Sequence, residues 1–164
     1  MKAGRLFTGI ALVLITVGLL VSPRTGNAAE KIRKAMYHCD FGKAKRVDAM
    51  LRNIYNLVNY YTINNIPYDV RVVSNSACVQ FMVKDRKGTK FAKKKIPAKV
   101  AKSIEERMAS LVDGYNLKVE QCAITLQRTN IARSKLKPFV SVIPSGQVRV
   151  VELHDKGFAY IKVK

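Results

Sequence analysis

Three cysteines, Cys39, Cys78 and Cys122, are the side chains of this sequence best suited to chemistry. A thiolate can attack electrophiles, exchange with disulfides or bind a metal ion. Because their number is odd, at least one thiol in an oxidising compartment is free, paired between chains or kept reduced for chemistry. His38 could support a thiolate at Cys39, whereas Asp40 would oppose it. A metal site built from His38 and the cysteines is not favoured, because the sequence has no CxxC and no HxxxH pair.

Each cysteine lies near or just past the end of a predicted strand. Short segments rich in β-branched and apolar residues predict strands over 34–40, 68–74 and 117–124. The carboxyl ends of parallel strands share one edge, where open α/β folds place their sites. We therefore expect the three cysteines to converge there, within one subunit or across an interface. Packing of each cysteine as a small buried hydrophobe remains the alternative.

Two of these cysteines precede helical segments. Cys122 comes just before a helix predicted over 125–137, and Cys78 opens a short helical segment predicted over 77–83. The start of a helix favours a negative charge and lowers the pKa of a nearby thiol. Cys122 and Cys78 are therefore both candidates for a reactive thiolate, and Cys78, Cys39 and His38 are candidates for a relay or resolving role beside Cys122.

Strands alternate with helices along the chain. This order predicts βαβ crossovers and an α/β fold with a mainly parallel sheet and helices on both faces. Segment 148–156 fits either a strand or a short helix. Further helices are predicted over 46–63 and from Pro97 to a C-cap at Gly114, and further strands over 139–143 and 158–163.

The first 28 residues predict a secretory signal peptide, cleaved after Ala28. Lys2 and Arg5 precede an uncharged run over 6–21, and small residues end the segment. An uncleaved anchor is the alternative, but the run is short for a membrane span, which needs about 20 residues. We expect a periplasmic protein with a single domain over 29–164.

The chain is strongly basic, with 30 Lys and Arg against 11 Asp and Glu and a net charge of +19. The positive charge is concentrated over 84–102, which includes a predicted basic loop over 84–95. Such a patch attracts anionic partners. Nucleic acid is not favoured, because Phe91 is the only aromatic residue there. An anionic surface is the expected partner, and a solvated loop is the simpler interpretation. The candidate anion-binding residues are Lys87, Lys90, Lys93, Lys94 and Lys95.

Several enzyme classes lack support. The sequence has no phosphate loop of the GxxxxGK[ST] type, no GxGxxG and no nucleophile elbow. We expect no bound cofactor and no resident metal. The absence of CxxC also weighs against a periplasmic disulfide enzyme.

The order and spacing of several segments resemble the DsrE/DsrF-like family of sulfur-relay proteins. The resemblance spans roughly residues 32–163. The segments that carry it are Tyr-His-Cys-Asp (37–40), Asn-Ile-Tyr-Asn-Leu (53–57), Val-Arg-Val-Val-Ser-Asn (70–75), Leu-Lys-Val-Glu-Gln-Cys-Ala-Ile-Thr-Leu (117–126), Val-Ile-Pro-Ser-Gly (142–146) and Gly-Phe-Ala-Tyr-Ile-Lys-Val (157–163).

The resemblance implies a three-layer α/β/α fold with a five-stranded parallel sheet, assembled as a homotrimer or hexamer. It also implies that segment 148–156 is a helix and that Cys122 carries a persulfide, passing sulfur between thiol or persulfide protein partners. The chain departs from the relay members in its export signal, in the sequence Ser-Asn-Ser-Ala-Cys (74–78) after the second strand, and in its basic stretch.

Two functions of different classes therefore remain. The first is a sulfurtransferase-like sulfur carrier that handles sulfur or thiols at Cys122. The second is a non-catalytic binding or assembly module, with structural cysteines and a basic loop that docks on an anionic surface.

Overall fold

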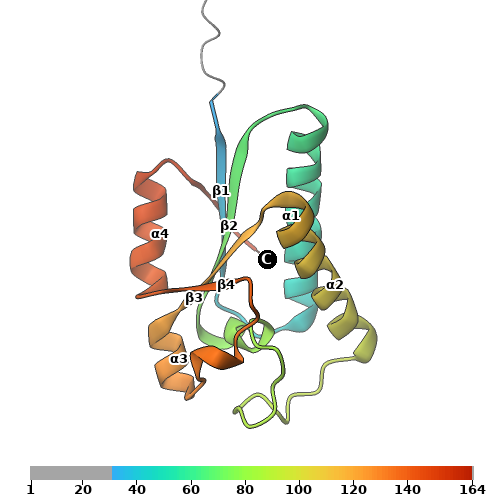
Figure 1. Ribbon diagram of the computed structural model, residues 1–164, viewed down its shortest axis with the longest axis vertical. Coiled ribbons are helices and arrows are strands. Elements are labelled where there is room, and N and C mark those ends of the chain that lie inside the picture. Colours follow the sequence, from blue (N-terminus) through green and yellow to red (C-terminus); the bar gives the residue numbers. More distant parts are fainter. Residues whose placement is uncertain (1–30, 164) are drawn as a thin grey trace, which may run out of the picture.

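The computed structural model describes residues 31–163, which form a five-stranded, all-parallel sheet with strand order β4-β3-β2-β1-β5 (Figure 1). The predicted α/β fold with helices on both faces of the sheet is confirmed. The strands are β1 (Arg33–Cys39), β2 (Tyr68–Ser74), β3 (Lys118–Cys122), β4 (Val140–Ile143) and β5 (Ala159–Ile161). The helices are α1 (Ala44–Ile63), α2 (Ala98–Tyr115), α3 (Ala123–Thr129) and α4 (Gly146–Asp155), with two short 3-10 helices, η1 (Ser76–Phe81) and η2 (Arg133–Lys135).

The predicted signal peptide over 1–28 lies outside the described residues. Within 31–163, no helix combines the length and the apolar character needed to cross a membrane.

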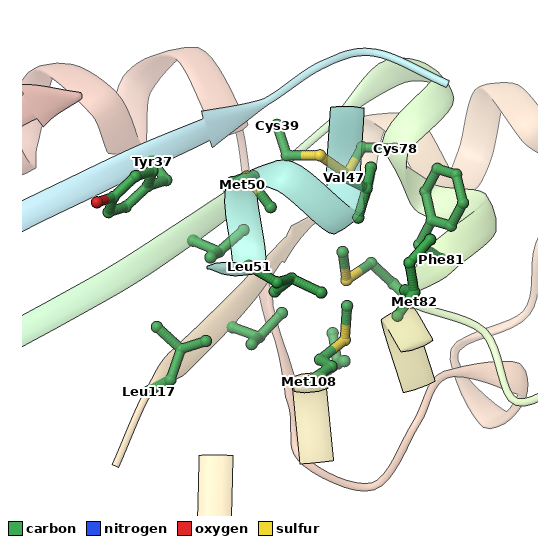
Figure 2. Close-up of a cluster of buried hydrophobic side chains, with 14 of the residues drawn as sticks. Tyr37, Cys39, Val47, Met50, Leu51, Cys78, Phe81, Met82, Met108 and Leu117 are labelled. Atoms are coloured by element: carbon green, nitrogen blue, oxygen red, sulfur yellow. A yellow bond between two sulfur atoms is a disulfide. The ribbon is translucent and has the colours of Figure 1, made fainter. Parts of the chain in front are cut away.

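Helices α1 and α2 cover one face of the sheet and form the main core (Figure 2). Met50, Leu51 and Ile54 on α1 recur at helical spacing, so they share the face that is turned toward the strands. Met108 and Leu111 of α2 join the same core. This amphipathic pattern explains why the helix over 46–63 could be predicted from the sequence.

Helix α4 covers the opposite face, where a smaller core contains Met36, Val73, Leu153 and Phe158. Successive residues of a strand point to opposite faces, so Val73 reaches this cluster while Val72 belongs to the main core. Figure 1 shows α4 on one side of the strands and α1 with α2 on the other.

The prediction of helix 125–137 was wrong in extent. Helix α3 begins at Ala123 and ends at Thr129, because Asn130 adopts a left-handed conformation with φ 53°. The chain then turns through η2, and Leu136 forms an antiparallel bridge with Val83.

Gly114 is not the C-cap of the second long helix. Helix α2 continues through it to Tyr115, and Asn116 takes the left-handed position with φ 53°.

The third predicted strand is also shorter than expected, because the chain turns into α3 directly after Cys122. Segment 148–156, which fitted either class, lies almost wholly in α4, whose first turn is capped by the Ser145 side chain accepting a hydrogen bond from the Val148 amide.

Candidate functional site

The three cysteines lie at the carboxyl edge of the sheet. Cys39 is the last residue of β1, Cys122 is the last residue of β3, and Cys78 lies in η1 just after β2. The strand register aligns these ends, because Cys39 pairs with Ser74 and Ser74 in turn pairs with Gln121. The parallel topology therefore brings the cysteines to one edge, as the sequence predicts.

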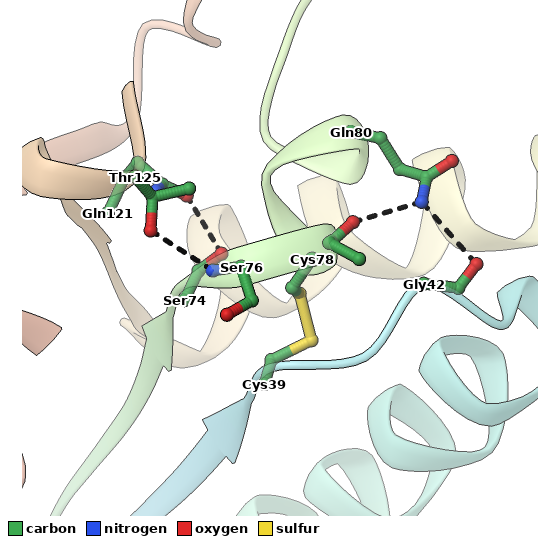
Figure 3. The surroundings of a disulfide bond; sticks show 9 residues. Cys39, Gly42, Ser74, Ser76, Cys78, Gln80, Gln121 and Thr125 are labelled. Atoms are coloured by element: carbon green, nitrogen blue, oxygen red, sulfur yellow. Dashed lines mark hydrogen bonds between the residues drawn. A yellow bond between two sulfur atoms is a disulfide. The ribbon is translucent and has the colours of Figure 1, made fainter. Parts of the chain in front are cut away.

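Cys39 and Cys78 form a disulfide (Figure 3). Their Cα atoms lie 5.7 Å apart, within the range that the bond requires, and both side chains are fully buried. In this state neither sulfur is available as a relay or resolving thiol. Cys122 is the free cysteine of residues 31–163 and is only 5% exposed.

The segment that follows β2 connects the disulfide to the surroundings of Cys122. The Asn75 amide donates to the Cys39 carbonyl at 2.9 Å, and the Ser76 amide donates to the Thr125 hydroxyl at 3.0 Å. Ser76 has φ 48°, a strained conformation for a residue with a side chain. The hydrogen bonds of Asn75 to Cys39 and of Ser76 to Thr125 hold this conformation in place. Strained backbone that is held in this way is typical of residues near functional sites.

Cys122 lies where two helices begin. It is the N-cap of α3, and the first residue of α4, Gly146, is close to it. Burial raises the pKa of the Cys122 thiol, but hydrogen bonds from the Gly146 amide, from the amide and hydroxyl of Thr125 and from the Ile124 amide outweigh it, so the pKa is lowered. The thiolate is therefore more populated at neutral pH than in an ordinary cysteine.

A buried charge network fixes α4 against the sheet. Glu120, two residues before Cys122, accepts hydrogen bonds from Arg149 of α4 at 2.7 Å and from Arg71 of β2 at 2.9 Å. These bonds lower the pKa of Glu120 although burial, the largest single influence, raises it. Because Arg149 lies one helical turn after Gly146, the network holds the start of α4 near Cys122.

Asn75 contributes a further polar group. Its side chain is 7% exposed, and its Oδ1 has no hydrogen-bond partner among the described residues. It lies beside Gly146 and therefore close to Cys122. A buried acceptor of this kind can receive a hydrogen bond from a protonated thiol or persulfide.

His38 is not brought into this group. It precedes Cys39 on β1, so these two side chains point to opposite faces of the sheet. The His38 ring packs edge-on against Tyr160 of β5 with centroids 6.2 Å apart, whereas Cys122 lies on β3, which β2 separates from β1. Its Nε2 is buried without a partner in residues 31–163. That part of the chain also contains no cluster of three or more His, Cys, Asp and Glu side chains that could hold a metal ion.

The basic loop over 84–95 has a defined conformation. Phe91 is buried, and Arg86 donates to the Lys94 carbonyl at 2.7 Å, which closes the loop on itself. The lysines that the sequence marked as anion-binding candidates all have exposed side chains: Lys87, Lys90, Lys93, Lys94 and Lys95.

Comparison with solved structures finds the protein of unknown function MTH1491 from Methanobacterium thermoautotrophicum. The match has a TM-score of 0.59 and 20% sequence identity, and it covers 80% of this chain and 98% of that one. The chain has a fold like that of MTH1491. At this level of identity, the likeness concerns the fold alone.

Among curated proteins, an uncharacterized protein from Aquifex aeolicus (strain VF5) is 25% identical over 131 residues. The match covers 78% of this chain and 55% of that protein, so the chain spans about half the length of this relative. No protein-family model matches the chain. The similarity is therefore to proteins of unknown function, and the DsrE/DsrF-like resemblance stays a prediction.

The sequence indicated Cys122 but not most of the groups that surround it. Thr125 could have been recognised, because a hydroxyl three residues after an N-cap faces the start of its helix. Ser145 could also have been recognised, because a serine followed by a helical segment is an N-cap signal. Asn75 carried no signal, because its role depends on the packing of α4.

Proposed function

We propose that this protein is a sulfur carrier that accepts and passes on sulfane sulfur through Cys122. The observation that carries the proposal is the position of one buried thiol at the N-cap of α3 and against Gly146 at the start of α4. Amides of these helix starts lower the pKa of the thiol. Such an environment stabilises the thiolate, which is the form of Cys122 that attacks sulfur.

The reaction is an exchange of sulfur without net oxidation. The Cys122 thiolate attacks the outer sulfur of a donor persulfide, R–S–SH. The S–S bond of the donor breaks, a new S–S bond forms at Cys122, and the donor leaves as the thiolate R–S⁻. Attack by an acceptor thiolate on the outer sulfur then regenerates the Cys122 thiolate. Burial of Cys122 shields the carried sulfur from unrelated thiols.

Export to the periplasm is part of the same proposal. The Cys39–Cys78 disulfide supports it, because disulfides persist in oxidising compartments and are rare in the cytoplasm. The bond also leaves Cys122 as the single free thiol of the described residues, so persulfide formation there does not compete with pairing to a neighbouring cysteine. For Cys39 or Cys78 to resolve the persulfide, the disulfide must first be reduced.

The test is loading of Cys122 with sulfur in the exported, oxidised protein. Treatment with a small persulfide donor should add the mass of one sulfur atom to the intact protein, and iodoacetamide should modify one thiol under native conditions. Cys122→Ser should abolish both additions and leave the circular dichroism spectrum unchanged. A native wild-type protein that takes up neither sulfur nor iodoacetamide would overturn the proposal.

A matched control separates the environment of Cys122 from the mere presence of a thiol. Ser110 is exposed on α2, an element that contains none of the cysteines. The double variant Cys122→Ser/Ser110→Cys therefore carries one ordinary thiol on the same fold. It should alkylate with the pH profile of a free cysteine, at higher pH than the wild type.

The second candidate function is docking on an anionic surface. It is favoured by the conformation of the basic loop, in which Phe91 is buried and the neighbouring Lys93, Lys94 and Lys95 are exposed to solvent. Binding to vesicles that contain anionic lipid, lost at high salt and lost in Lys93→Glu/Lys95→Glu, would establish this function. Absence of vesicle binding at low salt would dismiss it.

Assembly as a homo-oligomer, which the family resemblance implies, is also part of the proposal. Val148 and Val151 are 56% and 60% exposed on α4, and their spacing places them on one side of that helix. A second copy of the chain that covers this side would remove both valines from water. Light scattering should show a trimer or hexamer, which Val148→Glu/Val151→Glu should dissociate.

A further inference from the structure

A basic pocket of about 460 Å³ lies beside the cysteine site. Segments far apart in the sequence form it: η1 through Ser76, the basic loop through Lys90 and Lys94, and α3 through Thr125 and Arg128. None of the residues that line it is acidic. The fold therefore assembles three cations around one pocket.

These cations have no carboxylate partners. Within residues 31–163, Lys90, Lys94 and Arg128 form no ion pair, although acidic side chains pair with basic ones elsewhere in that part of the chain. The ammonium groups of Lys90 and Lys94 instead lie 5.4 and 5.5 Å from the ring centroid of the buried Phe91. Contact with the Phe91 ring holds both lysine side chains beside the pocket. Because neither ammonium group is paired with a carboxylate of the described residues, its charge is available to an anionic ligand.

A second pocket of about 440 Å³ shares Lys94 with the first. It adds Lys43, Lys45 and Lys95 and has no acidic lining residue. Several positive charges around adjoining concave surfaces produce a field that draws small anions inward.

Thr125 connects the basic pocket to the thiol. It lines the pocket, and its amide and hydroxyl both form hydrogen bonds with the sulfur of Cys122. Ser76 also lines the pocket, and its amide is fixed by the Thr125 hydroxyl at 3.0 Å, as Figure 3 shows. Thr125 is therefore shared between the pocket and the surroundings of Cys122.

We propose that this pocket binds the anionic end of the sulfur donor, and that the donor is a small sulfane-sulfur compound bearing a carboxylate or sulfonate group. The inference rests on the proposed function of Cys122 and adds the chemical class of its substrate. The cations Lys90, Lys94 and Arg128 hold the anionic end, and the sulfane sulfur reaches Cys122 past Thr125.

Two donors fit this class. With a carboxylate-bearing persulfide, the donor leaves as its thiolate when the outer sulfur moves to Cys122. With thiosulfate, the thiolate attacks the outer sulfur, the S–S bond breaks with its electron pair, and sulfite leaves while Cys122 becomes a persulfide anion. Both steps balance without a further oxidant or reductant.

The test compares two alkylating probes of similar size, iodoacetamide, which is neutral, and iodoacetate, which is anionic. The quantity measured is the ratio of the iodoacetate rate to the iodoacetamide rate at Cys122 in the native protein. The pocket should raise this ratio above that of a free thiol, and Lys90→Glu/Lys94→Glu should lower it about tenfold, the lower end of electrostatic steering effects. The iodoacetamide rate should change little.

The matched control is Lys99→Glu/Lys162→Glu, which makes the same change in net charge at exposed positions outside the pocket. It should leave the ratio within about twofold of the wild type, because neither lysine lines the pocket and the charges of exposed side chains are screened by salt. Loading of Cys122 by thiosulfate and by glutathione persulfide, each in wild type and Lys90→Glu/Lys94→Glu, then shows which anionic donor the pocket accepts.

The outcomes separate the two proposals. If iodoacetamide fails to modify native Cys122, the sulfur-carrier function is overturned, and this inference falls with it. If iodoacetamide reacts but the ratio is equal in wild type and in both double variants, the carrier function stands and the basic pocket is not its donor site. A ratio lowered only by Lys90→Glu/Lys94→Glu supports the inference.

Discussion

Gly146 lies so close to Cys122 that a side chain at position 146 would meet it. A Cβ atom built on Gly146 would be 3.4 Å from the Cβ of Cys122 and 3.2 Å from both the Cβ and the Nδ2 of Asn75. The glycine therefore favours a close approach rather than an unusual φ. This approach allows the first amide of α4 to donate to the Cys122 thiol.

Gly146→Ala should raise the pKa of Cys122. The added methyl group must displace Asn75 or the start of α4 by a few tenths of an ångström, which weakens the hydrogen bond from the amide to the thiolate. We expect a higher pKa of Cys122 and a lower alkylation rate at neutral pH. The measurement is the pH dependence of iodoacetamide alkylation.

Gly114→Ala is the control for this substitution. Gly114 lies within α2, and a Cβ there would meet nothing within 4 Å. The variant should leave alkylation unchanged and stabilise the protein by about 0.5–1 kcal/mol. An alkylation profile for Gly146→Ala that matches the wild type would show that the α4 amide does not set the pKa of Cys122.

Glu120→Gln should destabilise the fold and also alter Cys122. The substitution leaves Arg71 and Arg149 facing each other with reduced compensation, which should cost about 2–3 kcal/mol, less than for a fully buried pair because both arginines are partly exposed. A looser α4 should weaken the Gly146 contact and slow alkylation. Urea unfolding and the alkylation rate measure the two effects. If Glu120 acts on stability alone, Glu120→Gln should leave the alkylation profile of Cys122 unchanged.

The pH dependence of stability gives an independent check on Glu120. Its pKa in the folded state is below the ordinary value of 4.5, so its pairing stabilises the protein above that pH, and the contribution is lost as pH falls through the lowered folded value. The free energy of unfolding of the wild type should therefore decline below about pH 4.5 more steeply than that of Glu120→Gln. Parallel curves for the two proteins would contradict the assignment.

Removal of the disulfide should lower stability without removing the reactive thiol. The bond joins residues separated by 39 positions, and a loop of this size corresponds to about 4 kcal/mol of chain entropy in the unfolded state. Cys39→Ala/Cys78→Ala should show this loss in urea unfolding, and a reducing agent should destabilise the wild type but not the variant. Equal stability of oxidised and reduced wild type would exclude a stabilising role for the bond.

The sequence predicts those parts of the fold that depend on local pattern. Strand β2 over 68–74 and the long helix α1 were predicted because alternation and helical periodicity are visible within each segment. The helix over 125–137 was predicted too long, because polar residues beyond Asn130 fit a helix as well as a turn. In the structure Lys137 is buried and paired with Glu105, a contact that no local pattern shows.

The site likewise has parts that follow from local sequence pattern and parts that depend on contacts between distant segments. The position of Cys122 at the carboxyl edge follows from strand order, so it could be predicted. Which two cysteines pair could not be predicted, because three were expected at one edge and the choice depends on the adjacency of β1 and β2. The contribution of Gly146 was also missed, because it arises where α4 begins over the end of β3, a contact between segments that local patterns do not relate.

Thr125 gives the most direct test of how the thiol is tuned. Its hydroxyl donates to Cys122 and accepts from the Ser76 amide, so Thr125→Val removes both bonds, whereas Thr125→Ser retains them. We expect the valine variant to raise the alkylation midpoint of Cys122 and the serine variant to leave it near the wild-type value. A serine variant shifted as far as the valine variant would show that packing, not the hydroxyl, sets the pKa.

Linkage gives the same test a second readout. Because the pKa of Cys122 is below its ordinary value of 9.0 in the folded state, ionisation contributes stability that is fully present above that value and is lost as pH falls through the folded pKa. The stability difference between wild type and Cys122→Ser should therefore increase with pH up to about 9 and then level off. Thr125→Val should reduce this increase, because its thiol ionises nearer the unfolded value. A difference that is flat across this range would mean that the Cys122 pKa is the same in the folded and unfolded protein, and the thiolate would then have no special support from the fold.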